Sequence, residues 1–238
     1  MKRSSYGKLV TLAKNCLAEE ALWGETEAVS DPKTASAPKP RVGRAAPAAS
    51  LEELKKTALK CKACGLSKSR LNVVFGSGNP KAALLFIGEG PGFDEDHKGE
   101  PFIGRAGQLL TKIIESIGLT REEVYIANIV KCHPVIDPSD PEKRGNDRPP
   151  TPEEISSCLH FLEEQIELIK PKVICVLGNS AARTLLATEE GISKLRGVFT
   201  EYKGHKLMPT YHPAALLRNP SLKKDVWEDM KLIRAALK

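Results

Sequence analysis

Short apolar runs that alternate with helical patterns constrain the fold of this chain more than any other feature. Four runs are rich in aliphatic and β-branched residues, at 82–88, 124–130, 173–178 and 206–209. Stretches with helical spacing lie between and after them, at 106–117, 152–169, 180–187 and from 222 to the C-terminus. Near-continuous apolar strands that alternate with helices are typical of a parallel sheet covered on both faces. The sequence therefore predicts an α/β domain, a three-layer sandwich around a central four-stranded, mainly parallel sheet.

The first 50 of the 238 residues differ in composition from the rest. Residues 1–24 hold a helical pattern, and residues 25–50 are rich in Ala, Pro and Ser, with almost no large apolar side chain. Such a segment cannot bury enough surface to offset its ordering entropy. We expect a helical extension at 1–24, a flexible linker at 25–50 and the α/β domain at 51–238. The extension is either a loose appendage or a docking element for a protein partner.

Several protein classes are excluded or favoured by composition. No apolar run approaches the about 18 residues of a membrane span, and the N-terminus lacks the apolar region and cleavage site of a signal peptide. The sequence therefore predicts a cytoplasmic protein without a membrane span, and we expect a monomer. The net charge of +6 suits a polyanionic partner but does not identify one.

Six cysteines in such a chain indicate metal or redox chemistry before disulfides. Cys61 and Cys64 form a CxxC pair before the first apolar run, Cys132 follows the second, and Cys158 lies in the next helical stretch. A CxxC pair with two more thiolates completes a four-thiolate shell. Spacing alone does not separate zinc from an iron–sulfur cluster, and four unligated structural thiols are the other alternative.

Polar and glycine-rich segments follow three of the apolar runs. Residues 88–96 (GEGPGFDED) follow the first, Asn128 lies near the end of the second, and residues 211–218 (YHPAALLR) follow the fourth. Ligands of open parallel sheets bind beyond the carboxyl ends of the strands, so these groups mark the expected site. Two of these groups also have a simpler interpretation: the acidic segment as a solvated turn, and the lone His212 as a structural histidine. A loop leucine beside basic residues is nonetheless what a wedge in a DNA base stack needs.

Together, four segments resemble the family 4 uracil-DNA glycosylases, the iron–sulfur branch of the uracil-DNA glycosylase superfamily. They are GEGPGFDEDHKGEPFIGRAGQLL at 88–110, VYIANIVKCHP at 124–134, TPEEISSC at 151–158 and MPTYHPAALLRNP at 208–220. The resemblance covers about residues 51–238 and none of the N-terminal extension. It implies a uracil-DNA glycosylase-like fold and a DNA base excision repair enzyme. That enzyme would be a monofunctional hydrolase that releases uracil from uracil-containing DNA and leaves an abasic site.

The resemblance also implies a [4Fe-4S] cluster, with zinc the less favoured metal. Its ligands would be Cys61, Cys64, Cys132 and Cys158. The chain departs from the family pattern at VIDPSDPEKRGNDRPP, which lengthens the gap between the last two cysteines. Its prolines and charges predict an exposed loop whose basic residues are candidate DNA contacts. We expect the four ligands to stay in place and the cluster to order the DNA-facing edge of the sheet.

For the flipped base, the resemblance implies contacts from Gly90, Glu95, Phe102 and Asn128. Phe102 would stack on the uracil ring. Asn128 carries a donor and an acceptor that match uracil O4 and N3–H, whereas cytosine presents an amine and a bare nitrogen there. Glu95 would fill the space near C5 and exclude the methyl group of thymine. Gly90 belongs to a loop whose glycines permit a ligand to approach the backbone closely.

For the chemistry, the resemblance assigns Glu89 and His212. His212 would hydrogen-bond uracil O2 and stabilise the departing anion. Glu89 would hold or deprotonate the attacking water and stabilise the cationic sugar. A related covalent branch carries Gln after this Glu; Gly90 stands there instead, which predicts ordinary hydrolysis. Leu216 would be the wedge that fills the vacated place in the DNA stack, and Arg218 a DNA contact.

Two other functions are compatible with parts of the pattern. A non-catalytic DNA-binding or polymerase-associated module of the same fold would be favoured if Glu89, Asn128 or His212 were replaced, and all three are present. An iron–sulfur or zinc redox protein would use the sheet edge for a nucleotide cofactor. The absence of phosphate-binding and ribose-binding motifs in the sequence counts against that function.

Overall fold

A six-stranded sheet forms the centre of the part of the chain that the computed structural model describes, residues 48–238. The expected extension at 1–24 and nearly all of the linker at 25–50 lie outside these residues. The strand order is β1-β3-β2-β4-β6-β5. The strands are β1 (Ser77–Gly78), β2 (Leu84–Gly88), β3 (Tyr125–Asn128), β4 (Val173–Leu177), β5 (Thr200–Tyr202) and β6 (His205–Thr210).

The four central strands confirm the predicted parallel sheet. β3, β2, β4 and β6 pair in parallel, and each coincides with one of the four apolar runs. The two edge strands, β1 and β5, pair antiparallel with their neighbours and were not predicted. They contain two and three residues, which is too short for a periodic pattern to be recognised in the sequence.

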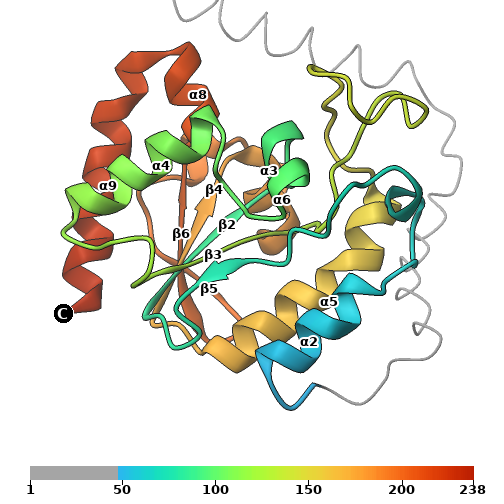
Figure 1. Cartoon of the computed structure of the whole chain (residues 1–238). Helices are drawn as coiled ribbons and strands as arrows, with labels where there is room; N and C mark the ends of the chain where they lie inside the picture. Colours follow the sequence, from blue (N-terminus) through green and yellow to red (C-terminus); the bar gives the residue numbers. More distant parts are fainter. Residues whose placement is uncertain (1–47) are drawn as a thin grey trace, which may run out of the picture. The chain divides into compact units, whose positions relative to one another are not determined.

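Helices cover both faces of the sheet, as expected for a three-layer sandwich (Figure 1). α2 (Leu51–Leu59), α5 (Pro152–Ile169) and α6 (Asn179–Leu186) pack on one face, and α4 (Arg105–Ser116) and α9 (Lys223–Leu237) on the other. The shorter helices are η1 (Gly65–Lys68), α3 (Phe93–Lys98), α7 (Ile192–Leu195), α8 (Pro213–Arg218) and η2 (Pro220–Leu222). None of the helices within residues 48–238 has the length and apolarity that crossing a bilayer requires.

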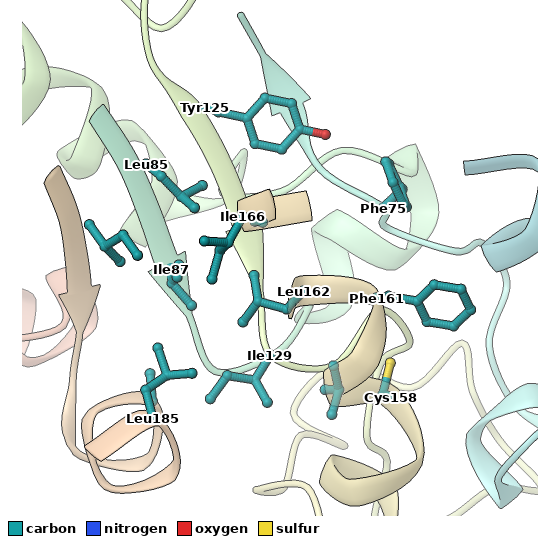
Figure 2. Close-up of a cluster of buried hydrophobic side chains, with 14 of the residues drawn as sticks. Phe75, Leu85, Ile87, Tyr125, Ile129, Cys158, Phe161, Leu162, Ile166 and Leu185 are labelled. Atoms are coloured by element: carbon teal, nitrogen blue, oxygen red, sulfur yellow. The ribbon is translucent and has the colours of Figure 1, made fainter. Parts of the chain in front are cut away.

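Side chains of the central strands divide between two cores because successive residues of a strand point to opposite faces. On β2, Leu85 and Ile87 join the core beneath α5, and Leu84 and Phe86 join the core beneath α4 and α9. Figure 2 shows the first core and places Cys158 at its margin, next to Phe161. The continuous burial of β2, β3 and β4 explains why their sequences are apolar without alternation.

Local capping fixes where two of these helices begin. The Ser50 hydroxyl accepts the Glu53 N–H at 3.3 Å at the start of α2. α5 begins with a reciprocal capping box, in which Thr151 accepts from the Glu154 N–H and the Glu154 carboxylate accepts from the Thr151 N–H. α5 therefore begins at Pro152 directly after the long loop, and this sets the position of Cys158 two turns later.

Candidate active site and cysteine cluster

A pocket of about 570 Å³ opens where the central parallel strands end. Every residue predicted to bind the base or to act in catalysis lines it: Glu89, Gly90, Glu95, Phe102, Asn128 and His212. Arg218 lines it as well. The expectation that the polar segments meet at one edge of the sheet is therefore confirmed, since they come from the ends of β2, β3 and β6.

Asn128 ends β3 with its side chain in this pocket and 1% exposed. Its Oδ1 is buried and has no hydrogen-bond partner within residues 48–238. Parallel register places Gly88, the last residue of β2, directly opposite. A Cβ on Gly88 would lie 2.5 Å from this Oδ1 and 2.5 Å from the Phe102 ring, so only glycine leaves room for both. A buried acceptor without a partner is costly unless a ligand supplies the donor.

Phe102 adopts a backbone conformation that aromatic residues rarely take. Its φ is +54°, in the left-handed region, which costs a residue with a side chain about 1–2 kcal/mol. The ring is buried at the pocket wall, with its centroid 5.5 Å from that of His212 and the planes tilted by 36°. Outliers of this kind persist only where the surrounding structure holds them, and they gather at functional sites.

His212 sits at the N-cap of α8, and its hydrogen bond determines its tautomer. The Ala214 N–H donates to Nδ1 at 3.1 Å, so the proton of the neutral ring is on Nε2. Desolvation by the surrounding protein, helped by the charge of Arg218, lowers the pKa of His212 to about 4. The ring is thus neutral near pH 7, with an N–H available as a hydrogen-bond donor.

Glu95 is fixed by three backbone N–H groups. Its Oε1 accepts from Ile103 and Gly104, both at 3.0 Å, and its Oε2 accepts from Gly92 at 3.2 Å. The carboxylate therefore joins the loop after β2 to the segment that carries Phe102. The role of Glu95 in joining these two segments was not predicted from the sequence. The exclusion of thymine by Glu95 stays a prediction.

Comparison with known proteins agrees with this arrangement. The family model of the uracil DNA glycosylase superfamily matches residues 75–231, most of the described chain. The chain belongs to this superfamily. The type-4 uracil-DNA glycosylase of Thermotoga maritima is 45% identical over 183 residues, 75% of this chain and 90% of that protein. The type-4 enzymes of Archaeoglobus fulgidus and Sulfurisphaera tokodaii are each 42% identical, over 77% and 78% of this chain and 92% and 84% of theirs.

One structural expectation about the site is wrong, although the presence of a leucine wedge stays a prediction. Leu216 was expected to stand in an exposed loop, but residues 213–218 form helix α8 and Leu216 is 1% exposed, packed in the core beneath α4 and α9. Leu217 is 42% exposed. The reason is local: His212 caps the helix and Pro213 at its first position has the φ that a helix needs. The helical register then turns one leucine inward and the next outward.

Four cysteines of the glycosylase lie near one another at the margin of the α5 core. Cys132 and Cys158 are buried in it, and Cys61 and Cys64 pack against it. The Cys132 thiol interacts electrostatically with those of Cys61 and Cys64, and the Cys158 thiol with those of Cys132 and Cys61. Burial raises the pKa of Cys132, and that of Cys158 to about 12. Cys175 lies apart from them in β4, fully buried.

The donors around these sulfurs fit a thiolate-ligated group. Arg70 Nη1 donates to Cys132 Sγ at 3.2 Å while its Nη2 donates to the Cys61 carbonyl at 2.8 Å. The Lys131 N–H donates to Cys158 Sγ at 3.3 Å. Within residues 48–238, no three Cys, His, Asp or Glu side chains converge as they would on a single ion. The four thiols and these donors fit a thiolate-ligated group, and the identity of the metal stays a prediction.

The long loop before α5 is an organised wall of the pocket. Asp147 Oδ1 lies 2.7 Å from Nε2 of the buried His133. The guanidinium carbon of Arg144 lies 4.4 Å from the centroid of the Phe93 ring. Both loop residues line the pocket. The Arg144 side chain is 74% exposed and pairs with Asp94 at 3.2 Å, and its contact with DNA stays a prediction. Arg148 also lines the pocket, and it makes a two-pronged bond with Glu154 at 2.7 and 2.8 Å.

Some supporting residues were not identified from the sequence. Lys131 is 1% exposed and donates to the Asn128 carbonyl at 2.7 Å and to Gln165 Oε1 at 2.6 Å. Gln165 in turn donates to the Phe75 carbonyl at 2.8 Å. Burial lowers the pKa of Lys131 to about 8. This network ties the backbone of Asn128 to α5. A lysine directly after an apolar run was the available signal, but the residues it bonds lie far away in sequence.

Proposed function

We propose that this protein removes uracil from DNA by hydrolysing the bond between uracil N1 and deoxyribose C1′. The orphaned Oδ1 of Asn128 carries the proposal, because uracil N3–H is the donor it lacks. The adjacent Nδ2 would donate to uracil O4. Cytosine has no N3–H and carries an amine at C4. Its N3 acceptor would therefore face the Oδ1 acceptor of Asn128, and its amine donor would face the Nδ2 donor. The type-4 relatives described above bear the name of this activity.

A uracil inside a duplex cannot reach this pocket without leaving the base stack. The pocket, about 570 Å³, is wide enough for a flipped base. The Phe102 ring would stack on it and the Asn128 amide would meet its edge. Glycine at 88 and 90 leaves the space that the neighbouring side chains occupy, because a Cβ at Gly88 would collide with Asn128 and Phe102 and one at Gly90 with Val130. Recognition would thus precede bond cleavage.

Bond cleavage leaves the electron pair of the C1′–N1 bond on uracil. The neutral His212 would donate its Nε2–H to uracil O2, where this negative charge accumulates. A neutral donor keeps its proton and its tautomer because Nδ1 is occupied by the Ala214 N–H. Glu89 would orient water for attack at C1′, take the proton that the water loses, and stabilise the cationic sugar. The products would be free uracil and an abasic site.

Release of radioactive uracil from an oligonucleotide with one deoxyuridine tests the proposed function directly. Alkali should then cleave the strand at that position, and oligonucleotides with cytosine or thymine there should stay intact. Binding of the same oligonucleotide without uracil release would instead support the non-catalytic DNA-binding module. A cytoplasmic location, a monomeric state and a partner for the N-terminal extension stay predictions.

We assign the wedge to Leu217 in place of Leu216. Leu217→Ala should lower uracil excision from a duplex about tenfold and affect a single-stranded substrate less, because only the duplex must be opened and held open. Leu216→Ala is the matched control and should lower the free energy of unfolding by about 2–5 kcal/mol through the cavity it leaves. Rates on both substrates, with thermal unfolding of both variants, separate the roles. Equal losses on duplex and single strand would contradict the wedge.

Cys61, Cys64, Cys132 and Cys158 would hold a [4Fe-4S] cluster. When bound, the cluster supplies a covalent tie between the segment before β1, the loop after β3 and α5. It would hold in place the end of β3 that bears Asn128 and would take no part in cleavage.

Cys61→Ala should therefore lose iron, visible absorption and much of the folded protein, whereas Cys175→Ala should keep its iron. Elemental analysis for iron, zinc and sulfide, with circular dichroism, measures this. A folded, iron-free Cys61→Ala variant with full activity would contradict the structural role. Zinc in place of iron in the wild type would contradict the cluster.

A further inference from the structure

The strained backbone at Phe102 is held from both sides by two charged side chains, those of Arg121 and Glu95. Arg121, in the turn before β3, donates from Nη1 to the Phe102 carbonyl at 3.0 Å and from Nη2 to the Pro101 carbonyl at 2.8 Å. Glu95 accepts the next two N–H groups, those of Ile103 and Gly104, at 3.0 Å each. Four consecutive residues, 101–104, thus have one backbone group each bound to a charged side chain.

Gly107 provides the space that this path requires. A Cβ at Gly107 would lie 1.9 Å from the backbone carbon and oxygen of Phe102, so no other residue fits there without moving the segment. Thr111, one turn later on α4, accepts from Arg121 Nη1 at 3.3 Å and donates to the Gly107 carbonyl at 3.2 Å. α4 and the guanidinium of Arg121 therefore enclose the Phe102 peptide together.

The Arg121 side chain makes this contact with little freedom. The residue is partly buried, and desolvation lowers its pKa. Its planar fork reaches two successive carbonyls at once, which a lysine ammonium cannot do with the same geometry. Without Arg121, the carbonyls of Pro101 and Phe102 would each lose a hydrogen-bond donor. The left-handed φ of Phe102 would also lose a restraint.

We propose that Arg121 is a positioning residue of the glycosylase, which holds Phe102 in its strained conformation so that the ring stays in the uracil pocket. Arg121 does not line that pocket, whereas Phe102 does, so its effect would pass through Phe102. The inference rests on the proposed function only for the identity of the base that stacks there. The clamp itself is a property of residues 95–121.

A double-mutant cycle tests this inference. Arg121→Met should lower kcat for uracil release about 10- to 100-fold and weaken inhibition by free uracil, with a smaller change in KM for the oligonucleotide. Phe102→Ala should have a similar effect. The double variant should be no slower than Phe102→Ala alone, because the ring that Arg121 positions is already gone. Losses that multiply in the double variant would overturn the proposal.

Arg183→Met is the matched control for a general effect on folding. Arg183 also binds two successive carbonyls, those of Glu189 and Glu190 at 2.7 and 3.1 Å, but does not line the pocket. It should lower the melting temperature without changing the inhibition constant of uracil. If Arg121→Met does not fold, Arg121→Lys serves in the same cycle and should show a partial loss.

A crystal structure keeps this inference separable from the proposed function. In Arg121→Met or Arg121→Lys, Phe102 should leave the left-handed region or its ring should leave the pocket. An unchanged Phe102 would overturn the clamp whatever the substrate is. Absence of uracil release by the wild type would overturn the proposed function alone, and additive losses on an active wild type would overturn the clamp alone.

Discussion

His212→Ala is expected to lower the rate of uracil excision by about 10²- to 10³-fold, the cost of removing one hydrogen-bond donor aimed at developing negative charge. The expectation follows from the position of the ring in the pocket and from the Ala214 N–H on its Nδ1, which leaves Nε2–H as the donor. Single-turnover cleavage of a deoxyuridine oligonucleotide measures the chemical step without product release.

His205→Ala is the matched control for this variant. His205 begins the same strand, β6, and its Nδ1 pairs with the Pro171 carbonyl at 2.7 Å, away from the pocket. Its replacement should reduce stability slightly and leave the cleavage rate within about twofold. A His212→Ala variant that is as fast as His205→Ala would remove His212 from the mechanism.

The pH dependence of the reaction should reflect the lowered pKa of His212. The folded protein protonates this ring only near pH 4, whereas the unfolded chain does so near 6.5. The neutral donor is therefore present throughout the range above about pH 5, and activity should show no step near 6.5 from this residue. Between 6.5 and 4 the unfolded state binds the extra proton, so this group makes the free energy of unfolding decrease as pH falls.

Melting temperatures of wild type and His212→Ala across this pH range check the sign. The variant should lose less stability than the wild type as pH falls from 6.5 to 4. An identical pH dependence in both proteins would mean that the ring titrates normally in the folded state.

Asn128→Asp should change base specificity as well as rate. Excision of uracil should fall by about 10²-fold or more, because the carboxylate has no donor for O4 and repels it. A carboxylate can instead accept a hydrogen bond from the amine of cytosine. The ratio of uracil to cytosine excision should therefore fall by more than the rate on uracil alone. Rates on matched oligonucleotides with uracil and cytosine opposite guanine measure this ratio.

Asn79→Asp controls for the added charge. Asn79 lies at the other end of the sheet, where its Oδ1 accepts the Lys81 N–H at 2.8 Å, a bond that aspartate can also make. Its rate and base preference should match the wild type. Unchanged uracil specificity in Asn128→Asp would mean that another group recognises the base, and the buried Oδ1 would lose its assigned role.

Local patterns predicted the central strands and the sheet edge that carries the pocket, whereas the roles of individual pocket residues came from the family resemblance. The four parallel strands are apolar throughout because both faces are buried, and their ends bring Gly88 and Asn128 into register. The Ser50 and Thr151 caps are encoded within four residues of each helix start. Such features depend on neighbouring residues in the chain, so a single sequence is enough to recognise them.

The error at Leu216 shows where this information ends. Two adjacent leucines in an apolar segment are equivalent as letters, and only the start of α8 after His212 decides which faces the core. The two edge strands were likewise not predicted, since β1 and β5 are too short to show a periodic pattern in the sequence.

The sequence by itself determined the α/β class, the strands that carry the site and the residue types that the pocket collects. Only the tertiary structure decided that Phe102 is strained, that Arg121 and Glu95 clamp it, that Lys131 ties Asn128 to α5, and that Leu217 faces outward. The physical reason is the range of the interactions. Strand burial and helix caps depend on residues a few positions apart, whereas these clamps join groups up to 34 positions apart whose approach requires the folded sheet.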